Sequence, residues 1–285
     1  MNIIRIHCND EAVAASPPDL FGLMADVERF SIEVPSEVAN VLAAGAPVFV
    51  GVSGGRDSQA LAYRVCAHLD DIGHQGRRFL IHADLGRVDW RDSLPVCERL
   101  AQRLGVELVV VRRNAGDMMD RWLSRWAANV ARYANLECVK LILPWSTAAQ
   151  RFCTAELKSQ VIAREMRRRF PEGDVVSAVG IRREESTKRA RMPAWKQDER
   201  TTRRRGAGHT WNPLLGWRRG DVNDYVRIRG DELHEAYRLY GSTRVSCAFC
   251  VLGSEHDLRA SSNCADNHAI YREMVALEAT STFSF

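Results

Sequence analysis

A short turn that contains two glycines constrains this chain more than any other segment. The turn, Ser53–Ser58, reads Ser-Gly-Gly-Arg-Asp-Ser and directly follows an apolar run over residues 47–52. Apolar residues then recur every fourth position from Leu61 to Leu69, which is the spacing of one face of a helix. The order predicts a buried strand, a tight turn and a helix over residues 57–70.

Such a turn is a candidate site for an anion. The first backbone N–H groups of a helix lack partners and carry a partial positive charge, so they attract phosphate. Gly54 and Gly55 allow the backbone to approach an anion without a Cβ in the way. Asp57 or Ser58 can cap the helix. Turns of this composition also join strands to helices with no ligand, so both interpretations stand on these residues alone.

Apolar runs of strand length alternate with helical patterns along the chain. This alternation predicts an α/β fold with a parallel sheet that is covered on both faces. The turn at Ser53–Ser58 and Asp84 both follow strands, and we expect them to face one crevice at the carboxyl edge of the sheet. The expected strands are 47–52, 78–83, 106–111 and 175–181; the expected helices are 36–44, 57–70, 92–104, 117–132, 155–168 and one at the C-terminal end.

The composition is that of a globular protein of 285 residues with a net charge of +4. No apolar stretch is long enough to span a bilayer, and the first residues lack the apolar core of a signal peptide. We therefore expect a cytoplasmic protein with no membrane partner. Eight cysteines in such a chain favour core thiols or metal ligands over disulfides, and Cys66 and Cys97 fall on apolar helix faces.

Positive charge is concentrated in one segment. Residues 187–207 contain eight lysines and arginines against two carboxylates, a net charge of +6, so the rest of the chain sums to −2. Such runs are most often solvated loops. Beside a nucleotide site, the segment would instead hold an anionic substrate or a nucleic acid backbone.

Four segments in order carry a family resemblance. Ser53–Ser58 resembles the PP-loop, Ser-Gly-Gly-x-Asp-Ser, of the N-type ATP pyrophosphatases, with Arg56 at the position of the usual lysine. Residues 151–158, 180–189 and 212–222 resemble the Cys-Thr-x-x-Leu-Lys, Gly-x-Arg-x-x-Glu-Ser and Pro-Leu-x-x-Trp…Asp-Val elements of the phosphoadenosine phosphosulfate (PAPS) reductase superfamily. The resemblance implies a Rossmann-like fold, of the adenine nucleotide alpha hydrolase type, that binds ATP or PAPS.

The resemblance also implies a set of binding residues. Arginine and lysine side chains would bind the phosphates through charge-assisted hydrogen bonds, and Asp57 and Asp84 would hold Mg²⁺. Asp57, Lys158 and Arg182 are the expected catalytic residues. The expected nucleotide-binding residues are Ser53, Gly54, Gly55, Arg56, Asp57, Ser58, Asp84, Arg151, Lys158, Arg182, Glu185, Ser186 and Arg189.

Cysteines give a second chemical signal. Cys247 and Cys250 are separated by two residues, a spacing that lets both thiolates reach one metal, with Cys264 and Cys153 as candidate further ligands. The spacing alone fits a zinc site, a redox pair, an iron–sulfur cluster or coincidence. The surrounding residues resemble the iron–sulfur branch of the superfamily, which includes the DNA-phosphorothioation sulfurtransferase and tRNA-thiolating enzymes and implies a [4Fe-4S] cluster.

These signals support three interpretations of function. The first is an ATP-dependent enzyme that adenylylates an acceptor, possibly a nucleic acid, and delivers sulfur from a donor protein such as a cysteine desulfurase. The second is a PAPS or adenylyl-sulfate reductase, although the C-terminal cysteine motif of the assimilatory enzymes is missing. The third is a non-catalytic nucleotide-binding subunit with structural zinc. The expected organisation is an extension over residues 1–45, a nucleotide-binding domain over 46–187 and a cysteine-containing region over 188–285.

Overall fold

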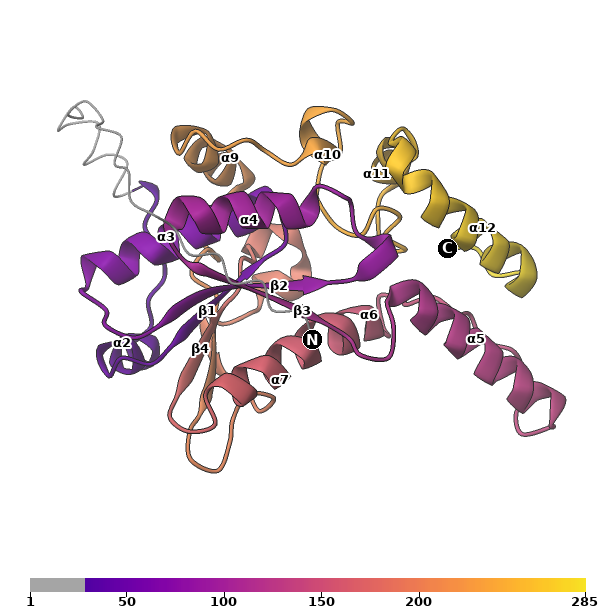
Figure 1. Cartoon of the computed structure of the whole chain (residues 1–285), viewed down its shortest axis with the longest axis horizontal. Helices are drawn as coiled ribbons and strands as arrows, with labels where there is room; N and C mark the ends of the chain where they lie inside the picture. The colour runs from indigo at the N-terminus through magenta and orange to yellow at the C-terminus, as the bar shows by residue number, and fades with distance from the viewer. Residues whose placement is uncertain (1–28) are drawn as a thin grey trace.

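The computed structural model describes residues 29–285, and expectations for residues 1–28 lie outside the described part. A six-stranded sheet in the order β3-β2-β1-β4-β6-β5 forms the centre of the fold (Figure 1). Neighbouring strands are parallel except for β5, which runs antiparallel to β6 at the edge. The predicted α/β class with a Rossmann-like parallel sheet is confirmed.

The elements follow the predicted order. The strands are β1 Val48–Val52, β2 Arg78–Asp84, β3 Glu107–Arg112, β4 Val175–Ala178, β5 Trp195–Gln197 and β6 Gly208–Trp211. The longer helices are α2 Ser36–Ala43, α3 Arg56–Asp71, α4 Ser93–Leu104, α5 Met118–Ala134, α7 Gln160–Arg169, α9 Arg219–Ile228, α11 Glu255–Ser262 and α12 His268–Ser281. The short helical segments are η1 Gly86–Val88, α6 Phe152–Thr154, η2 Ala155–Ser159, η3 Arg183–Glu185, α8 Thr187–Ala190, α10 Glu235–Arg238 and η4 Ala265–Asn267.

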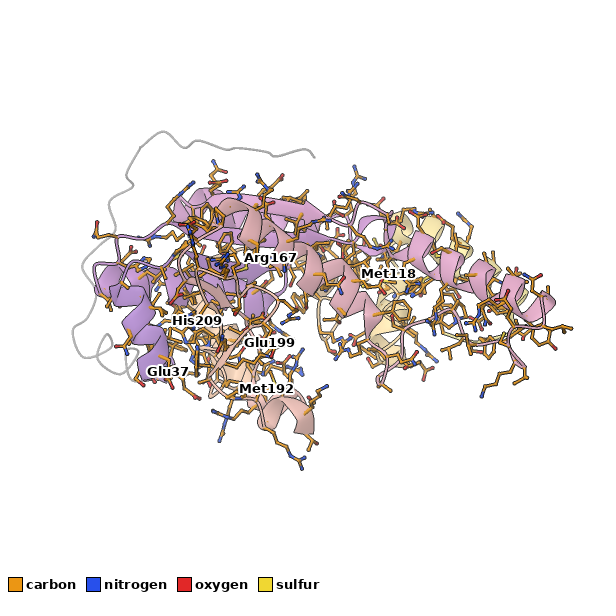
Figure 2. The ribbon with its side chains drawn as sticks, turned by 90° about the horizontal axis from the view of Figure 1, so that it is seen from below. Glu37, Met118, Arg167, Met192, Glu199 and His209 are labelled. Atoms are coloured by element: carbon orange, nitrogen blue, oxygen red, sulfur yellow. The ribbon has the colours of Figure 1, made fainter. Side chains whose placement is uncertain are left out.

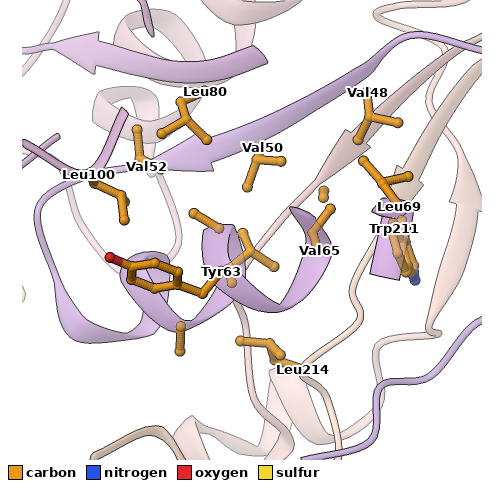
Figure 3. Packing of buried hydrophobic residues seen from close by; sticks show 14 of the residues in the cluster. Val48, Val50, Val52, Tyr63, Val65, Leu69, Leu80, Leu100, Trp211 and Leu214 are labelled. Atoms are coloured by element: carbon orange, nitrogen blue, oxygen red, sulfur yellow. The ribbon is translucent and has the colours of Figure 1, made fainter. Parts of the chain in front are cut away.

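Apolar side chains cover both faces of the sheet, as the sequence predicts. Alternation along β1 sends Val48, Val50 and Val52 to the face that is covered by α3, α4 and α9 (Figure 3). Phe49 points to the opposite face, where it packs with Phe79 of β2 and with residues of α7. The thiols of Cys66 and Cys97 are buried, in agreement with the sequence-based expectation.

A separate apolar cluster lies beyond the sheet. It joins η1, α5, the segment around Cys247 and α12, and it includes Trp122, Phe249 and Met274. Figure 1 shows α5 and α12 extending away from the sheet. Leu123 and Val130 of α5 are exposed, because only part of this helix is covered. Within residues 29–285, no helix is both long and apolar enough to cross a membrane.

The basic segment is not one loop, which corrects the expectation for residues 187–207. It contains α8 and β5. The strand β5 carries the chain from the carboxyl edge of the sheet, where the parallel strands end, to the amino edge, where they begin. The turn over residues 198–207 lies beside the start of β4, because Gly173 N donates to Arg205 O at 2.8 Å. Arg167 of α7 also donates to Arg200 O at 2.9 Å (Figure 2 labels Arg167 and the neighbouring Glu199).

The basic residues are therefore divided between two edges of the sheet. Those near Lys188 lie at the carboxyl edge with Ser53–Ser58, and those over 198–207 lie at the amino edge. Because β5 and β6 follow residue 187 and still join the central sheet, the sheet crosses the domain boundary that the sequence suggested. The three-part division of the chain remains a prediction.

Candidate active site

The turn Ser53–Ser58 is closed by its own side chains and by α4. Ser58 Oγ donates to Gly55 O at 2.7 Å and accepts from Ser53 N at 3.1 Å. Gly54 has a φ of +75°, and a Cβ at this position would lie 3.0 Å from Ser93 O. Only glycine fits this turn without strain. The helix α3 begins at Arg56 after Gly55, so neither Asp57 nor Ser58 is its N-cap residue.

Arg182 lies directly against this turn. A Cβ on Gly180 would be 3.1 Å from Asp57 O, so the missing side chain lets the segment after β4 approach the start of α3. Arg182 is 6% exposed, and its Nε donates to Asp57 Oδ1 at 2.5 Å. Its guanidinium also pairs with Glu184. Two carboxylates therefore balance a buried positive charge beside the turn.

The residues that follow Arg182 mainly bind one another. Glu185 accepts from Arg182 N at 2.7 Å and pairs with Arg189. Ser186 caps α8 by accepting from Arg189 N at 3.2 Å. The predicted ligands Glu185, Ser186 and Arg189 thus form a local hydrogen-bonded unit that holds Arg182 in place.

Asp84 and Arg56 both have protein partners. Asp84 accepts from Gly86 N at 2.7 Å and from Arg112 Nε at 3.0 Å. Arg56 is directed toward the C-terminal half of the chain, where Nη1 donates to Asn223 Oδ1 at 3.1 Å. The guanidinium of Arg56 also lies 4.5 Å from the centre of the Tyr237 ring.

Arg151 and Lys158 come from a different part of the chain. Arg151 is exposed and precedes α6, while Lys158 is half-buried in η2, which is one turn of π-helix. Within residues 29–285, neither cation has a carboxylate within ion-pair distance, so both are available to an anionic ligand. Among the charges that act on Asp89, that of Lys158 acts most strongly.

Asp89 is a residue that the sequence analysis missed. It follows η1, and its Oδ2 accepts from Leu85 N at 2.9 Å. Burial raises the pKa of Asp89, and the positive charges of Lys158 and His82 partly oppose that shift. A carboxylate between Val88 and Trp90, both apolar and buried, was the available signal, because charge is rarely placed in such a stretch without a role.

Three of the four predicted cysteines, Cys153, Cys247 and Cys250, lie near one another, and Lys158 lies near Cys247. Burial raises the pKa of Cys247 to about 12; Lys158 opposes the shift, while Asp89, Cys250 and Cys153 add to it. Ala248 N donates to Val88 O at 2.8 Å, which places Cys247 beside Asp89. Residues that are far apart in sequence thus meet next to one cation.

Cys250 and Cys264 also contact residues outside this group of cysteines. Arg244 Nη2 lies 3.4 Å from the Cys250 sulfur, and the two residues line a shallow hollow with Trp90 and Asp257. Cys264 is buried and hydrogen-bonded to the Tyr240 hydroxyl group.

The type of donor and its neighbourhood fit a metal or cluster. Cys153, Cys247 and Cys250 supply thiols, and Lys158 would offset the charge of their thiolates. Across residues 29–285, however, no group of three or more His, Cys, Asp or Glu side chains is already arranged to hold a metal ion. The cysteines therefore suit a metal or cluster by their chemistry and proximity, but they are not arranged in a preformed coordination geometry. The same holds for the carboxylates Asp57 and Asp84.

Solved structures with similar folds include three nucleotide enzymes. PAPS reductase from Candida auris, solved with phosphate, is 12% identical with a TM-score of 0.46 over 83% of this chain and 98% of that one. FMN adenylyltransferase from Candida glabrata, with FMN and an ATP analogue, is 16% identical with a TM-score of 0.47 over 86% and 70%. The U34-tRNA thiolase NcsA from Methanococcus maripaludis, with its [4Fe-4S] cluster, is 14% identical with a TM-score of 0.45 over 90% and 78%. At these values the likeness transfers no property to this chain.

Comparisons of sequence, unlike those of structure, assign the chain to a family. An uncharacterized 37.8 kDa protein of Escherichia phage 186 is 24% identical over 169 residues, which cover 56% of this chain and 42% of that protein. This chain thus matches less than half of that relative. The profile of the phosphoadenosine phosphosulfate reductase domain matches residues 47–252, which include the turn at Ser53–Ser58, Lys158, Arg182 and the Cys247–Cys250 pair. The chain therefore belongs to the phosphoadenosine phosphosulfate reductase domain family.

Proposed function

We propose that this protein binds ATP at Ser53–Ser58, adenylylates an acceptor with release of pyrophosphate, and transfers sulfur to the activated acceptor. The observation that carries the proposal is the proximity of Cys153, Cys250 and Lys158 to Cys247. The turn Ser53–Ser58, which would bind the phosphates, and the buried Arg182 both lie at the carboxyl edge of the sheet. Sulfur chemistry and nucleotide chemistry would then share one region of the fold.

The charges suit a phosphate ligand. Lys158 and Arg151 form no ion pair with any residue of the part 29–285, and each phosphate oxygen can accept from them. Arg182 is held in position by Asp57 and Glu184. A triphosphate would bind the Arg182 guanidinium in place of these carboxylates or together with them. Such cations stabilise the charge that develops on the leaving pyrophosphate when the acceptor oxygen attacks the α-phosphorus.

Two bound groups would complete the site. Mg²⁺ prefers carboxylate and phosphate oxygens, and Asp57 is the carboxylate nearest the turn that would hold it. Cys153, Cys247 and Cys250 would hold a [4Fe-4S] cluster, which supplies an iron that can carry sulfur when three thiolates bind it. A nucleic acid is the proposed acceptor, and the cations near Lys188 lie at the same edge of the sheet.

A reductase is the second candidate, and the proximity of thiols to Lys158 favours it too. A thiolate of Cys153 or Cys247 would attack the sulfur of PAPS to form an enzyme-bound thiosulfonate, and adenosine 3′,5′-bisphosphate would leave. A second thiol would then attack the thiosulfonate, form a disulfide and release sulfite. Lys158 would lower the pKa of the attacking thiol by its positive charge.

One set of assays separates these candidates. ATP binding and pyrophosphate release, with bulk tRNA as the probe acceptor, should fall at least about tenfold in Asp57→Ala and in Lys158→Ala, which corresponds to the loss of one charge-assisted contact. Arg205→Ala is the control, because Arg205 lies at the opposite edge of the sheet and pairs with Glu172. Unchanged ATP binding in both site variants would refute the proposed nucleotide site.

The sulfur step has its own readout. Protein purified without oxygen should contain iron and sulfide and show a brown absorption band that Cys247→Ala abolishes and Cys66→Ala retains. Zinc in place of iron would support the subunit with a structural metal. Sulfite release from PAPS in the presence of a thiol, without pyrophosphate release from ATP, would establish the reductase instead.

A further inference from the structure

Arg56 occupies the turn position at which the related loops carry lysine, yet its side chain is directed away from the turn. Nη1 donates to Asn223 Oδ1 at 3.1 Å, and Nη2 donates to Thr243 O. The guanidinium plane also lies over the ring of Tyr237, with 4.5 Å between its central carbon and the ring centre. Three contacts thus connect Arg56 with residues that are more than 160 positions later in the chain.

Tyr237 extends the same connection. Its hydroxyl oxygen accepts from Val245 N at 3.1 Å and lies near the backbone N–H of Arg56. A Cβ at Gly55 would be 3.5 Å from both the Tyr237 hydroxyl and Val245 Cβ, so this segment leaves only about the width of one carbon atom beside Gly55. The nucleotide turn and the segment 237–245 therefore pack directly on each other.

This segment leads straight into the cysteines. Val245 is two residues before Cys247, and Thr243 is fixed in a tight turn because its backbone N donates to Asp257 Oδ1 at 2.7 Å. A displacement of residues 243–245 would be passed to the Cys247–Cys250 pair through the short chain between them. The contact of Arg56 with Thr243 thus lies four residues before Cys247.

Arginine suits this connection and lysine does not. A planar guanidinium can donate in two directions while it stacks on an aromatic ring, whereas an ammonium group is a single point of charge. Lysine at this position would retain the charge and lose the simultaneous contacts with Asn223, Thr243 and Tyr237.

We propose that Arg56 is a positioning residue that fastens the segment 237–245, and with it Cys247 and Cys250, to the nucleotide turn. Occupation of the turn then changes the accessibility of the two thiols, and the thiols in turn change the affinity of the turn for nucleotide, because such coupling is reciprocal. The second statement rests on the proposed nucleotide site, whereas the fastening itself does not.

Thiol labelling of the full-length protein tests the fastening without any ligand. Peptide-resolved labelling with N-ethylmaleimide should modify Cys247 and Cys250 about tenfold faster in Arg56→Lys and Arg56→Ala than in the wild type, a factor that corresponds to about 1.4 kcal/mol. Cys138, which contacts Asn129 near the end of α5, is the internal control and should react at an unchanged rate. Arg103→Lys is the matched variant, because Arg103 pairs with Asp231 outside this connection.

Two further variants keep the test decisive. Asn223→Ala removes one acceptor at an exposed position and should speed labelling by about two- to threefold, even if the Arg56 variants fold poorly. Tyr237→Phe retains the ring beneath Arg56 and removes the hydroxyl that binds Val245, so its effect should be intermediate. Urea unfolding of each variant separates local opening from global loss of stability.

The outcomes distinguish the fastening from a phosphate contact. If Arg56 binds phosphate, Arg56→Lys leaves thiol labelling unchanged and Arg56→Ala weakens only nucleotide binding; that result would overturn the proposal. In the wild type, ATP or PAPS at saturation should change the labelling rates of Cys247 and Cys250, and Arg56→Ala should lose that response. If neither nucleotide binds the wild type, the proposed function fails, while the ligand-free rates still decide the role of Arg56.

Discussion

The replacement of Gly54 by alanine tests whether the shape of the turn Ser53–Ser58 depends on this residue. Gly54 has a φ of +75°, and a Cβ there would lie 3.0 Å from Ser93 O and 3.1 Å from Ser93 Cα. The left-handed conformation alone costs a residue with a Cβ about 1 kcal/mol. Ser93 is the first residue of α4, so its backbone cannot shift without moving a helix, and such overpacking costs about 1–3 kcal/mol more.

A matched glycine separates these two contributions. Gly73 has a φ of +62°, and a Cβ there would meet nothing within 4 Å. Gly73→Ala should therefore lower the free energy of unfolding by about 1 kcal/mol, from conformation alone. Gly54→Ala should lower it by about 2–4 kcal/mol, the sum of conformation and contact.

Urea denaturation followed by circular dichroism measures both values in the same protein. Gly54→Ala should also weaken ATP binding, because a widened turn no longer directs its N–H groups at one anion. Equal destabilisation by the two substitutions would refute the reasoning, since it would mean that the approach of Ser93 to the turn adds no constraint.

Two further predictions concern charges around the site. Burial would raise the pKa of Asp117, but hydrogen bonds from Arg87 and from Asp120 N hold it at about 2. Asp117→Asn should therefore lower the free energy of unfolding by about 1–2 kcal/mol at pH 7. This difference from the wild type should disappear as the pH falls from about 4 to 2, as measured by urea unfolding at each pH. The sign follows because a lowered carboxyl pKa stabilises the fold only while the group is ionised. The pKa of Cys247, which burial raises to about 12, should fall in Asp89→Asn and rise further in Lys158→Ala, since Asp89 adds to the shift and Lys158 opposes it. Labelling rates of Cys247 between pH 7 and 10 measure both changes, and a shift in the same direction for the two variants would contradict the assigned charges.

Local sequence determined the elements that surround the nucleotide turn. The apolar run before Ser53, the glycines and the four-residue repeat after them specify a strand, a turn and a helix through contacts between near neighbours. The same periodicity places the thiols of Cys66 and Cys97 in the core, where the structure has them. These features depend on short-range geometry, which a single sequence states directly.

Tertiary structure decided which side chains meet. Arg56 is directed to Asn223 and Tyr237, and no local pattern connects residues so far apart. The basic segment was expected to act as one surface, yet the antiparallel strand β5 sends its second half to the opposite edge of the sheet. That outcome depends on strand pairing, which composition does not reveal.

The cysteines show what the sequence predicts and what only the tertiary structure decides. Their spacing identified Cys247 and Cys250 as a candidate pair, and the need of a metal site for further ligands added Cys153 and Cys264. Only the packing of η1 on the segment that begins at Val245 brings Cys247 near Asp89 and Lys158, and only packing places Cys264 against Tyr240. Long-range burial creates these electrostatic neighbourhoods, because charges interact strongly only where the fold has removed the water between them.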